Sequence, residues 1–316
     1  MSEKIFENDE ISVYFSAGRG ETAVLSYSSM RHDFAVKGIP ALAMMQSYGY
    51  DTFGIIARRD NWYPIPSMQA VMQALRARLA SYSCRLAYGS SMGAYGAIKH
   101  SKGFGCDFVL ALAPQYTIDP QRVAEWDGRY HSNFRAELNA DMEISPQDLG
   151  GQITVIADPF YKMDMRHAAY IEKLGAVNII RASGCEHLVI QPLAGREVMG
   201  NFLQALMTGN HRRAESIYRD SRKASPYYRG IMLMYLAQRY INRHDPDSAA
   251  LAVEASIAAY DRHPQVFLAA SKIHTLCKDY NKALEAALEA QARDPNSAWT
   301  ARVVNEARRR ASAAAI

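Results

Sequence analysis

The chain has 316 residues, enough for two domains of ordinary size. Its 49% hydrophobic and 22% charged residues are typical of a globular protein, and the near balance of 36 basic and 32 acidic residues argues against nucleic-acid binding. The sequence has no apolar run long enough to span a membrane, and its first residues lack the pattern of a secretory signal. We therefore expect a cytoplasmic protein without a membrane span.

The cysteines are few and lie far apart in the sequence. None belongs to a CxxC motif or has the spacing of metal ligands, so we expect no metal site and no cofactor. The usage suits a reducing compartment, although an even number leaves a disulfide open. The four are Cys84, Cys106, Cys185 and Cys277.

Short apolar runs alternate with amphipathic stretches over the first 200 residues. The run at 108–112 is almost continuously hydrophobic, which is typical of a strand buried on both faces of a parallel sheet. The alternation predicts an α/β fold with a mostly parallel sheet. Predicted strands cover residues 11–15, 22–28, 52–57, 85–88, 108–113, 153–157 and 177–181. Predicted helices cover residues 34–46, 68–80, 93–101 and 166–174.

One long stretch interrupts this alternation. Residues 116–150 separate two predicted strands by far more than the usual loop of about 2–6 residues. Long ordered insertions of this kind often act as lids, so the segment is interpreted as a small cap over a site, with His131 as a candidate substrate contact. An additional surface helix with a loop is the alternative.

The strongest motif is a G-x-S-x-G pentapeptide at residues 89–93, centred on Ser91. It follows an apolar strand and opens a segment with helical character, which is the setting of a nucleophile elbow. Side chains at the two glycine positions would collide with neighbouring backbone in so sharp a turn. Small residues after the motif would let the helix lie close to the sheet.

This segment resembles the α/β-hydrolase fold, over residues of roughly 10 to 205. The resemblance implies a nucleophile, an acid and a histidine in that order along the chain. Ser91 is then the nucleophile, and His187, which follows a small-residue turn after the last predicted strand, is the general base. Asp158 is favoured as the acid because it ends a predicted strand 29 residues before His187; Asp164 is the alternative.

The resemblance also implies an oxyanion hole formed by two backbone amides. One would come from Met92, directly after the nucleophile. The other is assigned to Ser28, with Ser29 next in preference, and the loop there lacks the HGGG pattern of some lipases. Trp62 and Tyr63 follow another predicted strand and are candidate walls of a substrate pocket, with packing under a loop as the alternative.

The pattern changes after about residue 200, where strand-like runs give way to alanine-rich helical periodicity. Ala214, Ala249 and Ala283 lie in similar segments, 35 and 34 residues apart. This region resembles degenerate tetratricopeptide repeats, whose period is about 34 residues. The alternative is a plain helical bundle. We predict an α/β-hydrolase domain over residues 1–208 and a helical domain over residues 209–316.

Together these features predict a serine hydrolase without a cofactor, acting on a small ester or an acylated glycan through an acyl-enzyme. A carboxylesterase or carbohydrate O-acyl esterase is favoured, and an acyltransferase or serine peptidase would use the same residues. The alternative class is an interaction scaffold with an inactive hydrolase domain. In either case the C-terminal helices are expected to contact a protein partner or a second copy of the chain.

Overall fold

The computed structural model describes residues 2–262, 264–295 and 297–314. Two compact units are present, Met1–Arg219 and Asp220–Ile316. The domain boundary predicted at residue 208 falls just after α8 (Arg196–Met207). No helix among the described residues is both long enough and apolar enough to cross a bilayer.

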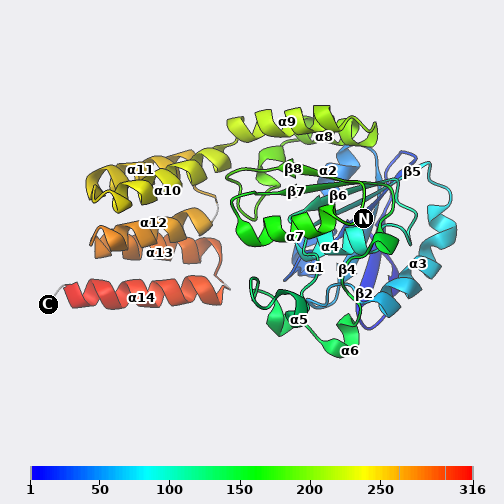
Figure 1. The fold of residues 1–316 in the computed structure, drawn as a ribbon, viewed down its shortest axis with the longest axis horizontal. Helices are drawn as coiled ribbons and strands as arrows, with labels where there is room; N and C mark the ends of the chain where they lie inside the picture. Colours follow the sequence, from blue (N-terminus) through cyan, green and yellow to red (C-terminus); the bar gives the residue numbers. More distant parts are fainter. Residues whose placement is uncertain (1, 263, 296, 315–316) are drawn as a thin grey trace. The chain divides into compact units, whose positions relative to one another are not determined.

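Figure 1 shows the sheet of the first unit. It has eight strands in the order β1-β2-β4-β3-β5-β6-β7-β8. β2 pairs antiparallel with β1 and β4, and the strands from β4 across to β8 are parallel. The strands are β1 (Glu3–Glu7), β2 (Ile11–Ser16), β3 (Thr22–Tyr27), β4 (Asp51–Ala57), β5 (Cys84–Ser90), β6 (Phe108–Leu112), β7 (Gln152–Ala157) and β8 (Val177–Arg181).

The central strands are buried on both faces, as their continuous hydrophobic runs predict. Val109, Leu110, Ala111 and Leu112 of β6 all have zero exposure. The predicted mostly parallel sheet flanked by helices, followed by a helical region, is confirmed. β1 was not predicted, because this edge strand is largely exposed and lacks an apolar run.

The helices of this unit begin and end close to the predicted positions with one exception. The single helix expected over residues 34–46 is two short helices, because Gly38 lies between them at φ 62° and Pro40 follows. The helices are α1 (Phe34–Lys37), α2 (Leu42–Ser47), α3 (Ile65–Leu79), α4 (Met92–Lys99), α7 (Lys162–Glu172), α8, and α9 (His211–Ala224), which runs past the end of the unit.

The insertion at 116–150 is made of short turns and not of one long helix. It contains α5 (Pro120–Val123), η1 (His131–Asn133), α6 (Ala136–Asn139) and η2 (Pro146–Asp148). The buried ammonium of Lys99 fastens it to α4 by donating to the carbonyls of Asp141 and Glu143, at 3.1 and 2.8 Å, and to the Asp148 carboxylate at 3.0 Å. Tyr95 on the same helix donates to the Met142 carbonyl at 2.6 Å.

The second unit is all helical, and its successive helices pack in pairs (Figure 1). They are α10 (Pro226–Asn242), α11 (Pro246–Ala259), α12 (Pro264–Leu276), α13 (Tyr280–Arg293) and α14 (Ala298–Ala314).

A local motif recurs at the start of α9, α11 and α13. A residue at positive φ (Gly209, His244 and Lys278) precedes each helix, and a side chain then caps the amide three residues further on. The capping residues are Asn210, Asp245 and Asp279, and the fourth residue after each is the buried alanine that defined the repeat: Ala214, Ala249 and Ala283. The 34- to 35-residue spacing in the sequence thus corresponds to a helix start that recurs with the same cap and the same buried alanine.

Candidate active site

Ser91 occupies a strained turn between β5 and α4. Its backbone has φ 53° and ψ −121°, a conformation that L-residues rarely adopt and that costs about 1–3 kcal/mol. The turn is held by the Ser91 amide, which donates to the Leu112 carbonyl of the neighbouring strand at 2.8 Å. The predicted strand, sharp turn and helix are all present, and strain held in this way is a feature of functional sites.

The two glycines of the pentapeptide are required by close backbone contacts. A Cβ atom on Gly89 would lie 2.2 Å from the Gly93 carbonyl oxygen. A Cβ on Gly93 would lie 2.7 Å from the Tyr27 carbonyl oxygen of β3. Neither neighbour is a flexible side chain, so larger residues would force the turn apart. The structure therefore shows the steric crowding at Gly89 and Gly93 that the motif predicts.

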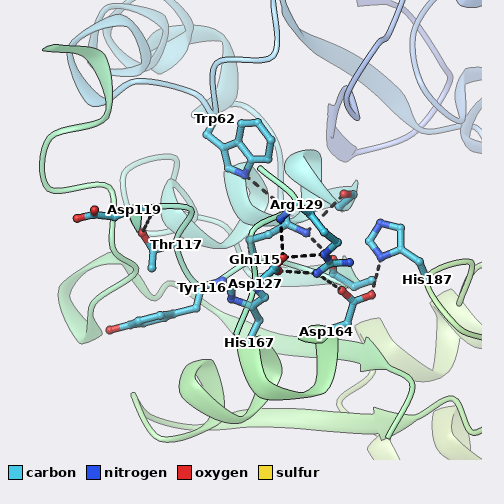
Figure 2. A network of polar contacts seen from close by, with 12 residues as sticks. Trp62, Gln115, Tyr116, Thr117, Asp119, Asp127, Arg129, Asp164, His167 and His187 are labelled. Carbon is cyan, nitrogen blue, oxygen red and sulfur yellow. Dashed lines mark hydrogen bonds and ion pairs between the residues drawn. The ribbon is translucent and has the colours of Figure 1, made fainter. Parts of the chain in front are cut away.

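His187 lies in the loop after β8 and pairs with Asp164 (Figure 2). Its Nδ1 is 2.5 Å from Asp164 Oδ2, and the carboxylate is fully buried in the first turn of α7. The side chain of His187 keeps 30% of its exposure, so part of the ring is open to solvent. This is the arrangement of a histidine whose tautomer is fixed by a carboxylate.

Asp158, which the sequence favoured as the partner of His187, has a different role. Its Oδ1 accepts the Phe160 amide at 2.9 Å and its Oδ2 accepts the Glu186 amide at 2.6 Å. Both carboxylate oxygens are therefore committed to backbone, which leaves Asp164 as the acid that contacts the imidazole. Asp158 instead holds in place the loop that carries His187.

Gln115 contacts the Ser91 side chain and Tyr130 lies near it. Neither residue was singled out from the sequence. Gln115 Nε2 donates to Ser91 Oγ at 3.5 Å and to the Ala113 carbonyl at 3.3 Å, while its Oε1 accepts the Trp62 indole N–H at 3.3 Å. The Tyr130 phenol lies near the Ser91 side chain. Burial raises the pKa of Tyr130 to about 12, so this hydroxyl keeps its proton at neutral pH.

Among the hydrogen bonds of the described residues, none joins Ser91 to His187 directly. Both follow carboxyl ends of parallel strands at the same edge of the sheet. Between them lies Arg129, whose guanidinium is 4.9 Å from the Tyr130 ring and donates to Asp164 Oδ1. Hydrogen bonds between catalytic groups commonly tighten only in the substrate complex.

The two predicted oxyanion donors differ in their availability. Met92 is the first residue of α4, and the first amides of a helix have no partner within it. Ser28 is unsuitable, because its amide donates to the Ile55 carbonyl at 3.1 Å and its hydroxyl accepts the Ala57 amide at 3.0 Å. The prediction of Ser28 is corrected on this ground. Ser29, the next residue, lies past these contacts at the end of the strand.

Trp62 and Tyr63 were predicted to line the substrate pocket, and the structure places both in the core. Each has zero exposure, at a positive φ of 52° and 53°. The Tyr63 hydroxyl donates to the Ser28 carbonyl at 2.6 Å, and its ring packs edge-on against Tyr27. Trp62 packs against Tyr130 and orients Gln115. Both side chains are fully buried, so neither can line a substrate pocket.

A second polar cluster adjoins Asp164 and was also missed by the sequence analysis (Figure 2). Arg129 donates through Nη2 to Asp127 Oδ2 and Asp164 Oδ1, each at 2.7 Å, and through Nε to Asp127 Oδ1 at 2.9 Å. His167 Nε2 lies 3.0 Å from Asp127 Oδ2, and the Tyr116 amide donates to His167 Nδ1 at 3.0 Å. His167 is thus part of a buried network.

The charges in this cluster follow from its hydrogen bonds. His167 Nδ1 accepts an amide proton, so its Nε2 carries the hydrogen given to Asp127. Burial lowers the pKa of His167 in spite of that carboxylate, which keeps the ring neutral. Burial opposes the charge on Asp127, but the bonds from His167 and Arg129 outweigh it and hold the Asp127 pKa well below its usual range. Among the described residues, no cluster of His, Cys, Asp or Glu has the makings of a metal site.

The chain was compared with protein families, curated proteins and solved structures. No family model and no curated protein matches it. An esterase of Pyrococcus furiosus is 14% identical, with a TM-score of 0.43 over 66% of this chain and 91% of that one. A capsule O-acetyltransferase of Neisseria meningitidis serogroup A is 12% identical, with a TM-score of 0.44 over 65% and 93%.

A third similar structure is FphF, a fluorophosphonate-binding serine hydrolase of Staphylococcus aureus. It is 11% identical, with a TM-score of 0.42 over 68% of this chain and 97% of that one. At these values of identity and TM-score, the likeness carries no information about substrate or activity. Any assignment of function has to come from the geometry of the site.

Proposed function

We propose that the chain is a serine hydrolase that cleaves esters through an acyl-enzyme on Ser91. The observation that carries the proposal is the strained turn of Ser91 at the same sheet edge as the His187–Asp164 pair. A serine hydroxyl is a weak nucleophile at neutral pH and needs a base, and a histidine oriented by a buried carboxylate supplies one.

The reaction would begin with attack of Ser91 Oγ on the ester carbonyl while His187 Nε2 takes the hydroxyl proton. Throughout the reaction the Nδ1–H of His187 donates a hydrogen bond to Asp164 Oδ2, and the carboxylate stabilises the imidazolium without taking its proton. The amides of Met92 and Ser29 would donate to the oxyanion of the tetrahedral intermediate. On its collapse the alcohol leaves with the proton from His187, and a water activated by the same histidine then hydrolyses the acyl-enzyme.

The substrate class proposed is an ester of modest size, with O-acylated carbohydrates favoured. The insertion between β6 and β7 supplies only short turns beside Ser91, among them the segment with Tyr130. Its action as a cap remains a prediction. An acyltransferase would share the first half of the reaction and differ only in the acceptor of the acyl group.

The test is covalent labelling with a fluorophosphonate probe, followed by peptide mass spectrometry. Labelling should fall on Ser91 and be lost in Ser91→Ala and His187→Ala, while Ser90→Ala, which changes the preceding residue, should retain it. Hydrolysis of p-nitrophenyl acetate and of acetylated sugars would then separate a general esterase from a carbohydrate esterase. A folded protein that is not labelled would contradict the proposed mechanism and favour the scaffold alternative.

For the helical unit we propose contact with a protein partner or a second copy of the chain. A cavity of about 330 Å³ lies along α12 and α14, and Leu276 and Trp299 on its lining are about half exposed. The recurrent caps and alanines support the tetratricopeptide-like interpretation of the sequence. Light scattering of the purified full-length chain would detect self-association, and Trp299→Ala should weaken it if this cavity is the contact surface.

A further inference from the structure

The network beside Asp164 joins three separate segments of the first unit. Arg129 and Asp127 belong to the insertion, Asp164 and His167 to α7, and His187 to the loop after β8. One guanidinium nitrogen, Arg129 Nη2, bridges the two carboxylates at 2.7 Å each. Asp164 therefore gives one oxygen to Arg129 and the other to His187.

The charges of this network leave one carboxylate uncompensated. Asp127 and Asp164 are both buried, and Arg129 neutralises one of them. His167 is neutral, because its Nδ1 accepts the Tyr116 amide and burial disfavours the imidazolium. An imidazolium at His187 would balance the remaining charge. The positive charge of Arg129 and the negative charge of Asp127 therefore determine how strongly the site favours an imidazolium at His187 during the reaction.

We propose that Arg129 is a positioning residue that orients Asp164 and, together with Asp127, sets the charge against which His187 is protonated. The inference rests on the proposed function, in which His187 is the general base. Arg129 suits this role because its planar guanidinium binds Asp127 through Nε and Nη2, and Nη2 also donates to Asp164. Its guanidinium also lies over the rings of Tyr130 and Tyr161, at 4.9 and 5.4 Å.

Other ionisable groups near the pair bear on the expected pH dependence. Tyr130 and Tyr161 remain neutral, because burial raises the pKa of each phenol. Asp158 is taken up by backbone amides. Three segments carry the ionisable groups that face Asp164 and His187. The insertion contributes Arg129, Asp127 and Tyr130, and the segment after β7 contributes Asp158, Tyr161 and His167. The histidine loop contributes Glu186.

The experiment measures the titration of the His187 ring by imidazole ¹⁵N NMR and, separately, the rate of fluorophosphonate labelling from pH 5 to 9. Arg129→Gln removes the cation, so protonation of His187 becomes easier and its titration should move to higher pH. Asp127→Asn removes an anion, and the titration should move to lower pH. A charge within about 4–6 Å of an ionisable group changes its protonation equilibrium by about tenfold or more, and Arg129 bonds the same carboxylate as His187.

The labelling rates should follow the same two directions. At pH 6, Arg129→Gln should be labelled about tenfold or more slowly than the wild type, with a smaller loss at pH 9, because alkaline pH favours the free base in both proteins. Arg129→Lys should restore the titration and only part of the rate, because an ammonium keeps the charge without the fork. Arg122→Gln is the matched control, since Arg122 lies in the same insertion and pairs with the partly exposed Glu143.

The two readouts separate the two proposals. A His187 titration that moves to higher pH in Arg129→Gln and to lower pH in Asp127→Asn would support the role of Arg129 and Asp127, even if the wild type were not labelled. The missing label would then contradict only the hydrolase function. Unchanged titrations in folded Arg129→Gln and Asp127→Asn variants would overturn the inference while leaving the labelling of Ser91 as it stands. If Asp127→Asn does not fold, Arg129→Gln against Arg129→Lys decides the question alone.

Discussion

His187 Nδ1 and Asp164 Oδ2 lie 2.5 Å apart, while Asp158, which is equally buried, bonds the backbone of the residue next to His187. The two aspartates should therefore respond differently to the same substitution. Asp164→Asn should lower kcat/KM for an activated ester by about 10³-fold or more, because the imidazole loses its fixed tautomer. Asp158→Asn should cost about tenfold and lower the melting temperature. Equal losses would contradict the assignment of the acid.

Gln115 has a defined orientation, because the Trp62 indole donates to its oxygen and leaves its nitrogen directed to Ser91. Gln115→Ala removes this donor, and a lost hydrogen bond of this kind is worth about 1 kcal/mol, so labelling should slow about fivefold. Trp62→Phe should produce a similar loss without touching Ser91. Full activity in Trp62→Phe together with a loss in Gln115→Ala would show that the indole is not what orients the amide.

Gly93 is confined by the Tyr27 and Ser28 carbonyls, which a Cβ would approach to 2.7 and 2.9 Å. Gly93→Ala should lower the stability by about 1–3 kcal/mol and abolish labelling, since overpacking moves backbone in the turn that holds Ser91. The matched control is Gly175→Ala, where the nearest atom is the end of the Leu149 side chain at 3.3 Å. Thermal unfolding and labelling of the two variants compare the sites directly.

His100 should make the first unit sensitive to mild acid. Burial lowers its pKa to about 4 from a model-compound value of 6.5, while its Nε2 is bonded to the Tyr63 carbonyl at 2.9 Å. Below pH 6.5 the unfolded chain takes up a proton that the folded state refuses, so stability falls as pH decreases toward 4. The loss attributable to this group approaches about 3 kcal/mol. Urea unfolding from pH 7 to 4.5 should show a flatter dependence in His100→Gln.

The repeated caps of the helical region predict local effects on stability. The carboxylates of Asp245 and Asp279 each accept the amide three residues further on, at 3.1 and 3.2 Å. Asp245→Ala and Asp279→Ala should each cost about 1 kcal/mol, seen as faster amide exchange in α11 and α13. Ser91 labelling should be unchanged in both. Asp247→Ala, in the first turn of α11 but without the capping bond, provides the comparison.

The sequence predicted the sheet and the nucleophile turn because both are local patterns. Continuous apolar runs identified the buried strands, and the glycines around Ser91 reflect steric contacts within a few residues or with the adjoining strand. The exposed edge strand β1 and the break at Gly38 gave weaker signals. The first is polar, and the second depends on a positive φ that composition alone does not reveal.

The parts of the site that could not be predicted depend on contacts between distant segments. Asp158 and Asp164 both follow β7, and spacing along the chain cannot show which one the histidine loop will meet. Ser28 looked suitable as an oxyanion donor until its amide was found paired with Ile55. The bond of Arg129 to Asp164 has no local signature, since the two residues are 35 positions apart in the sequence.

The bonds of Lys99 to residues 141, 143 and 148 have a mechanical consequence. They hold the later half of the insertion against α4, the helix that begins directly after Ser91. We therefore expect the two segments to move together. The earlier half is held separately, through the bonds of Arg129 to Asp127 and Asp164. Displacement of that half would break the Arg129–Asp164 bond, so the position of the insertion and the orientation of the acid are coupled.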